Sequence, residues 1–194
     1  MKVLIDNGHG VNTPGKRSPD GSLREYLYAR EIADRVVSEL KNSGIDAERI
    51  VKEDVDISIS ERCKRANAIY KATGKKAILI SVHCNAAGNG SSWMNARGWS
   101  VHVSTNASKK SKELATCFAN IAMSMGLKVR KPLPNQPYWV QNLGICRDTN
   151  CPAILVENFF MDNKQDCEFL LSPEGRDQIV DLHVNAILKY IKGV

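Results

Sequence analysis

AILISVHCNA, at residues 77–86, is an apolar run that ends abruptly in side chains able to bond or coordinate. A short run rich in β-branched residues predicts a strand buried on both faces of a parallel sheet. In open α/β sheets, ligands bind at the carboxyl ends of the strands. His83 directly follows the run and is therefore well placed for chemistry. Taken alone, a hydrogen-bonded core or loop histidine is the commoner interpretation.

The composition predicts one globular domain over residues 1–194, with no linker or internal repeat. The apolar content of 43% and charged content of 25% are ordinary for such a domain. A net charge of +6 and a pI near 9.0 favour an anionic partner, either nucleic acid or a polymer such as bacterial wall. The basic residues are scattered and form no nucleic-acid motif, so nucleic acid is not expected as a partner.

Targeting signals are absent from the sequence as given. Met1 and Lys2 lead directly into a short strand-like segment, too short for the apolar region of a signal peptide. No apolar run approaches the ~20 residues of a membrane span, so no membrane partner is expected. We therefore expect synthesis in the cytoplasm, or an extracellular protein if a leader has been removed.

The six cysteines lie far apart, a pattern that suits reduced, buried thiols better than a disulfide framework. Cys146 and Cys151 alone are close enough in the chain to pair or to hold a metal, and no second cysteine pair accompanies them.

Hydrophobic periodicity predicts an α/β fold: a mostly parallel twisted sheet of about six strands with helices on both faces. Strands are expected over 2–6, 45–51, 77–82, 98–104 and 152–156, and helices over 23–41, 58–70, 109–125 and 172–190. Residues 131–148 predict a long excursion near the sheet edge, because they contain three prolines.

Three details of these elements can be checked directly. The strand over 98–104 alternates apolar and polar residues, which predicts a half-exposed strand with His102 on its polar side. His183 lies on the apolar stripe of the last helix and is interpreted as a core histidine. Ile59 is expected to face inward from the helix over 58–70.

Two further chemically active residues follow from local pattern. In DNGHG, residues 6–10, the glycines allow a tight turn with positive φ, which would let His9 point back over the strand end. Glu25 lies four residues before Ala29, on the core-facing stripe of the first helix. It is either a charge favoured by the helix N-terminus or a buried carboxylate that needs a partner such as a metal.

A third strand end, after PAILV at residues 152–156, carries Glu157. Carboxyl ends of parallel strands converge, so His9, Glu25, His83 and Glu157 are expected to meet. Two histidines and one carboxylate with an open fourth position form a catalytic zinc set. The other carboxylate would then serve as general base. Spacing does not decide which glutamate has which role, and no HExxH motif is present.

The chain resembles the zinc-dependent N-acetylmuramoyl-L-alanine amidases often called amidase type 3. The matching pieces are, in chain order, DNGHG at 6–10, Glu25 leading a helix through Ala29 and Ala33, Glu61-Arg62 with Ala66-Asn67, SVHCNA at 81–86, Gly98 opening a strand, and PAILVE at 152–157 followed by Phe160 and Asn163.

This resemblance implies that His9, Glu25 and His83 bind Zn²⁺ and that Glu157 is the catalytic carboxylate. The implied reaction is hydrolysis of the amide between N-acetylmuramic acid and L-alanine in peptidoglycan. Asp6 and Asn85 are hypothesised to orient the zinc ligands.

Two features depart from the family pattern. Asn158 stands where the family often has glycine, and the insert between Asn85 and Gly98 is long, which bears on substrate selectivity. The compact form and the absent signal peptide resemble a phage or prophage endolysin, expected to act as a monomer on the wall after release.

Two other functions remain open from the sequence. A zinc peptidase or carboxypeptidase would need a cationic clamp for a substrate carboxylate, for which Arg62 and Arg147 are candidates. A non-catalytic wall-binding module would be expected to have lost a ligand or Glu157, whereas all four residues are present.

Overall fold

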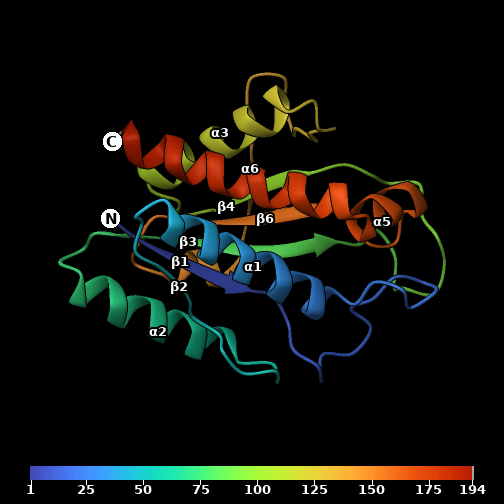
Figure 1. Ribbon diagram of the computed structural model, residues 1–194, viewed down its shortest axis with the longest axis horizontal. Coiled ribbons are helices and arrows are strands. Elements are labelled where there is room, and N and C mark those ends of the chain that lie inside the picture. The colour runs from blue at the N-terminus through green and yellow to red at the C-terminus, as the bar shows by residue number, and fades with distance from the viewer. Residues whose placement is uncertain (194) are drawn as a thin grey trace.

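The computed structural model describes residues 1–193, which form one six-stranded sheet flanked by helices (Figure 1). The strands are β1 (Lys2–Asn7), β2 (Ala47–Arg49), β3 (Ala77–Asn85), β4 (Ser100–Ser104), β5 (Trp139–Gln141) and β6 (Ala153–Phe160). The helices are α1 (Glu25–Asn42), α2 (Ile59–Ala72), α3 (Lys109–Ser124), α4 (Gly144–Arg147), α5 (Lys164–Leu171) and α6 (Pro173–Lys192). The predicted α/β class is thus confirmed.

The strand order is β2-β1-β3-β6-β4-β5, and every neighbouring pair is parallel except β4 with β6. The carboxyl ends of β1, β3 and β6 therefore meet at one edge of the sheet. The amino end of β4 lies at the same edge, because β4 runs in the opposite direction. This edge is where the sequence places the candidate site residues.

Two hydrophobic clusters cover the two faces of the sheet, as alternation of side chains along each strand requires. One face packs against α1, α3 and α6, with residues such as Ile5, Ile80 and Val156 pointing toward them. The other face, with Leu4 and Leu79, packs against α2 and α4. In Figure 1, α1 and α6 lie across the sheet, and α2 lies on the other side of it from α1.

β4 corrects the sequence prediction of a half-exposed strand. The side chains of Ser100, His102 and Ser104 are only 0%, 5% and 1% exposed. β4 is an interior strand between β6 and β5, and both of its faces are covered. Sequence alternation records polarity, not exposure, and these three polar residues are buried.

Other differences concern short elements. Ile59 is 47% exposed, not inward, because it is the first residue of α2. The excursion over 131–148 adds the edge strand β5 and the short helix α4. The sequence prediction missed α5, a short helix capped by Asn163, whose side chain accepts a hydrogen bond from the Asp166 N–H.

The cysteine prediction is confirmed, since all six are free thiols and five of them are buried. Among residues 1–193, no helix combines the length and apolar character needed to cross a membrane.

Candidate metal centre

His9 lies just beyond β1, at the edge of the sheet. Its own backbone has φ +61°, whereas Gly8 and Gly10 do not have positive φ, which corrects the predicted role of the glycines. The glycines are needed for close approach instead. A Cβ on Gly8 would lie 2.3 Å from Cε1 of His83, and one on Gly10 would lie 2.0 Å from the backbone nitrogen of Asp56.

Glu25 is the first residue of α1 and is 1% exposed. Its backbone N–H donates to the Lys16 carbonyl at 2.9 Å, which joins the helix start to the preceding loop. Its carboxylate Oε1 accepts a hydrogen bond from the Cys84 N–H at 3.0 Å. The predicted core-facing carboxylate is therefore confirmed, and it reaches across to β3.

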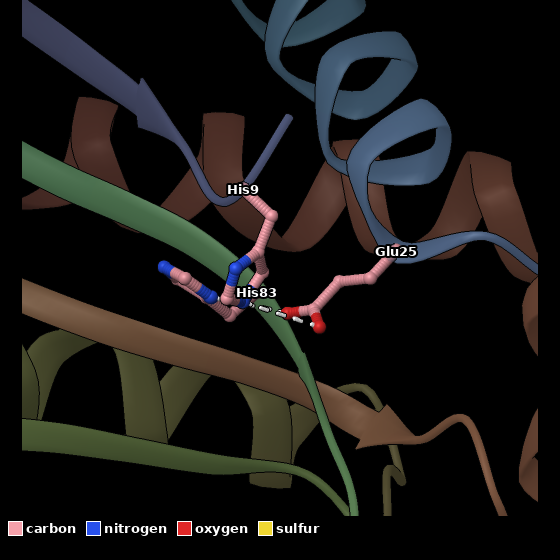
Figure 2. A group of neighbouring side chains, drawn as sticks. All are labelled: His9, Glu25 and His83. Atoms are coloured by element: carbon pink, nitrogen blue, oxygen red, sulfur yellow. Dashed lines mark hydrogen bonds and ion pairs between the residues drawn. The ribbon is translucent and has the colours of Figure 1, made fainter. Parts of the chain in front are cut away.

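His9, Glu25 and His83 converge (Figure 2). Nε2 of His9 lies 3.3 Å from Oε2 of Glu25, and Nδ1 of His83 lies 3.0 Å from Oε1. The two imidazole rings are edge to face, with centroids 5.0 Å apart. One ligand atom from each residue falls within 4.8 Å of the others.

The two histidines favour the ionised, carboxylate form of Glu25. Burial would raise the pKa of Glu25, but its hydrogen bonds with His83 and His9 outweigh this and hold that pKa below its usual range. Burial would lower the pKa of His83, but the hydrogen bond to Glu25 outweighs burial, so the pKa of His83 is raised above its usual value. A negative charge is thus retained in a nearly water-free position.

The donor set fits a zinc ion. Nitrogen and oxygen ligands of tetrahedral zinc lie roughly 3.4 Å apart, close to the two separations measured above. Oε2 of Glu25 is buried and, apart from the 3.3 Å contact with Nε2 of His9, has no hydrogen-bond partner in the described part of the chain. A cation at this point would satisfy that oxygen. A cavity of about 580 Å³ opens beside His9 and His83.

Glu157 lies on β6, directly opposite His83 in the β3–β6 register. Paired residues of adjacent strands project from the same face, so the Glu157 side chain is directed to the side of His83. Burial and the nearby charge of Glu25 raise the pKa of Glu157 to about 7, against opposing effects of His83 and Lys16. Its Oε2 has no hydrogen-bond partner within residues 1–193.

Arg62 on α2 is 2% exposed and holds the turn that carries His9. It donates to Asp6 at 2.6 Å, to the Asn7 carbonyl at 2.7 Å and to the His9 carbonyl at 3.5 Å. A second arginine, Arg30, also donates to the His9 carbonyl, at 3.1 Å. Arg62 is therefore fully engaged and is not free to clamp a substrate carboxylate, contrary to that sequence hypothesis.

The predicted orienting residues act differently from the hypothesis. Asp6 accepts from Arg62 and from the Ser81 hydroxyl, so it reaches His9 only through Arg62. The Asn85 side chain accepts from the Ala86 N–H and makes no hydrogen bond to His9, Glu25 or His83. Arg147, the other proposed clamp, donates to Asp148 and Asn142.

Sequence reasoning missed the residues that hold the insert over 86–97. Buried Asp162 accepts from the backbone N–H groups of Ala87 and Gly88, each at 2.8 Å. Asp166 accepts from the Gly98 N–H at 2.7 Å. Both follow β6 by a few residues, but their spacing carries no recognisable signal.

The hydrogen bonds of Asn158 show why this chain has asparagine at a position where the family often has glycine. Its Oδ1 accepts hydrogen bonds from Trp99 Nε1 and His183 Nε2, both at 3.2 Å. It thus joins β6 to α6 and to the residue that precedes β4, directly behind Glu157. His183 is fully buried, which confirms its interpretation as a core histidine.

Comparisons with known proteins identify relatives of this chain. The chain is 25% identical over 190 residues to an endolysin of Bacillus phage SPP1, and it spans 65% of that protein's length. It is 26% identical over 192 residues to the N-acetylmuramoyl-L-alanine amidase CwlM of Bacillus licheniformis, covering 97% of this chain and 68% of that protein.

Among solved structures, an N-acetylmuramoyl-L-alanine amidase from Clostridium difficile 630 matches with a TM-score of 0.82 and 26% identity. The match covers 98% of this chain and 96% of that one. The model of the Amidase_3 family, described as N-acetylmuramoyl-L-alanine amidase, matches residues 3–189. The chain therefore belongs to the Amidase_3 family of N-acetylmuramoyl-L-alanine amidases.

Proposed function

We propose that this protein is a zinc-dependent N-acetylmuramoyl-L-alanine amidase that cleaves the amide between N-acetylmuramic acid and L-alanine in peptidoglycan. The observation that carries the proposal is the convergence of His9, Glu25 and His83 at one sheet edge, with Glu157 opposite His83. Membership of the Amidase_3 family and the amidase relatives support the choice of substrate.

In this proposal His9, Glu25 and His83 hold the zinc ion. When bound, zinc polarises the scissile carbonyl and makes water a stronger acid. Glu25 supplies the negative charge of the ligand set, and the Cys84 N–H fixes its carboxylate. The turn that carries His9 is fixed by Arg62 and Arg30 through the His9 carbonyl.

Glu157 is the proposed general base. It accepts a proton from the attacking water and then delivers that proton to the departing amine of alanine. Burial raises the pKa of Glu157 above that of an ordinary carboxyl group, which suits a group that must first accept a proton and later deliver it. Its unpartnered Oε2 is available for this exchange.

The cavity of about 580 Å³ beside the two histidines would accept the substrate around the scissile bond. Thr13, Ile57 and Ile59 line it together with His9 and His83. Action at the bacterial wall, as an endolysin, is supported by the name of the phage relative. The net positive charge of +6 favours attraction to an anionic wall.

The deciding experiment is digestion of purified peptidoglycan, followed by labelling of newly exposed α-amino groups and mass spectrometry of the fragments. We expect amino-terminal alanine to appear, to stop on addition of a zinc chelator and to resume when zinc is restored. Release of amino groups from other residues would indicate a peptidase. No release from several types of wall would contradict the enzymatic function.

A further inference from the structure

Three cations without acidic partners gather beside the candidate metal centre. Lys16 and Arg17 belong to the loop after β1, and Arg24 immediately precedes α1. All three are exposed, and none forms an ion pair or a side-chain hydrogen bond with another of the described residues 1–193. In contrast, Arg65 and Arg97 each pair with a carboxylate.

These cations line a small cavity of about 180 Å³ whose lining contains no acidic residue. The other lining residues are Val11, Thr13, Gly15 and Tyr26. Because like charges held close together repel, such a group is stabilised when an anion enters. The volume is too small for a whole substrate but suits one charged group of it.

The cavity has a defined position relative to the metal centre. Thr13 lines both this cavity and the larger one beside His9 and His83, so the two adjoin. The Lys16 carbonyl accepts a hydrogen bond from the backbone N–H of Glu25 at 2.9 Å. The cationic loop is therefore tied directly to a proposed metal ligand.

Two further contacts fix the loop. Arg17 and Arg24 form an antiparallel β-bridge, which places their backbones side by side. The insert over 86–97 packs against the same loop, since a Cβ on Gly90 would lie 3.3 Å from the carbonyl oxygens of Gly15 and Arg17.

We propose that Lys16, Arg17 and Arg24 form a subsite for a carboxylate on the peptide stem of the substrate, close to the scissile amide. Arginine guanidinium groups match carboxylates in geometry and donate two parallel hydrogen bonds to them. The inference rests on the proposed function, because it assumes that the peptide stem lies along this loop.

The test uses two synthetic substrates, N-acetylmuramoyl-L-alanyl-D-glutamate and the same compound with both carboxylates of the glutamate converted to amides. We expect the wild-type protein to cleave the acid with a kcat/KM about tenfold or more above that of the amide, as charge-assisted hydrogen bonds imply. The triple variant Lys16→Gln, Arg17→Gln, Arg24→Gln should lose this preference, mainly through a higher KM for the acid.

A matched triple variant, Lys71→Gln, Lys110→Gln, Lys112→Gln, removes the same charge from exposed positions at the opposite edge of the sheet and should keep the preference. Zinc content and melting temperature, measured for all variants, establish that each is folded. Equal kcat/KM for both substrates with the wild type, or an unchanged preference in the first triple variant, would overturn the subsite while leaving the amidase function in place.

Failure of the wild type to cleave either substrate or peptidoglycan would overturn the proposed function itself. The synthetic substrates carry no phosphate. Weaker binding of the triple variant to intact walls, without any preference between the two substrates, would therefore assign the cations to phosphate-bearing wall polymers and overturn the carboxylate subsite.

Discussion

His83 on β3 and Glu157 on β6 occupy the same register position of two adjacent parallel strands. The backbone hydrogen bonds of the sheet therefore set their relative position, not a flexible loop. A β-bulge immediately after His83 ends this regular pairing. His83 also contacts Glu25, whereas Oε2 of Glu157 has no hydrogen-bond partner among the residues described.

The first prediction concerns Glu157. Glu157→Gln should lower kcat by about 100-fold or more, because general base catalysis contributes that much, while bound zinc stays near one per chain. Turnover of muropeptides and metal analysis of the same samples measure both quantities. The exposed Glu168→Gln on α5 should behave as wild type. Full activity of Glu157→Gln would remove Glu157 from the proposed mechanism.

The second prediction concerns metal binding. Zinc at 100 times its dissociation constant should stabilise the native state by about 2.7 kcal/mol and raise the melting temperature, because only the folded chain brings the three ligands together. Glu25→Gln should abolish most of this rise, since it removes the only negative charge of the ligand set. Thermal unfolding with and without zinc tests this. An equal rise in both proteins would show that zinc binds elsewhere.

The third prediction concerns Gly8. Gly8→Ala should weaken zinc binding strongly, because the added methyl would lie 2.3 Å from the His83 ring and must displace it. Zinc titration measures the affinity. Gly193→Ala, where the new methyl meets only an ordinary contact at 3.4 Å, is the control. Unchanged affinity in Gly8→Ala would mean that His83 does not need its present position.

The fourth prediction concerns Arg62. Arg62→Met leaves Asp6 buried without its partner, so the free energy of unfolding should fall by about 3–5 kcal/mol. The turn with His9 should loosen, and zinc affinity should fall as well. Arg35→Met breaks an exposed pair with Asp177 and should cost about 1 kcal/mol or less. Denaturant unfolding compares the two, and equal losses would contradict the central role of Arg62.

The fifth prediction concerns pH and His183. Burial lowers the pKa of His183 to about 3. Below pH 6.5 the unfolded chain protonates this histidine but the folded chain does not, so stability is retained above pH 6.5 and falls as the pH decreases. Between pH 6.5 and pH 5 the loss from this residue should be about 2 kcal/mol.

His183→Gln keeps an amide donor for Asn158 but does not titrate. The difference in unfolding free energy between wild type and variant should therefore shrink by about 2 kcal/mol between pH 7 and pH 5. Chemical denaturation at a series of pH values measures it. A constant difference would place the titration of His183 near its ordinary pKa in the native state.

Local sequence pattern alone determined the positions of the central strands and most of the candidate site residues. Apolar runs located β1, β3 and β6, and the residues directly after or within their ends, His9, His83 and Glu157, lie at one edge of the sheet as expected. The helical stripe placed Glu25 toward the core. Such signals are local, because strand and helix periodicity is written in residues a few positions apart.

Tertiary structure decided the rest, since it depends on contacts between residues far apart in the chain. The polar side of β4 is buried because α4 packs against this strand and the Trp139 ring of β5 stacks on His102, which alternation along β4 does not record. Arg62 forms hydrogen bonds with a turn more than fifty residues earlier in the chain, and Asn158 joins Trp99, just before β4, to α6. Which cations remain without a carboxylate was likewise settled only by packing, because pairing is a property of neighbours in space and not in sequence.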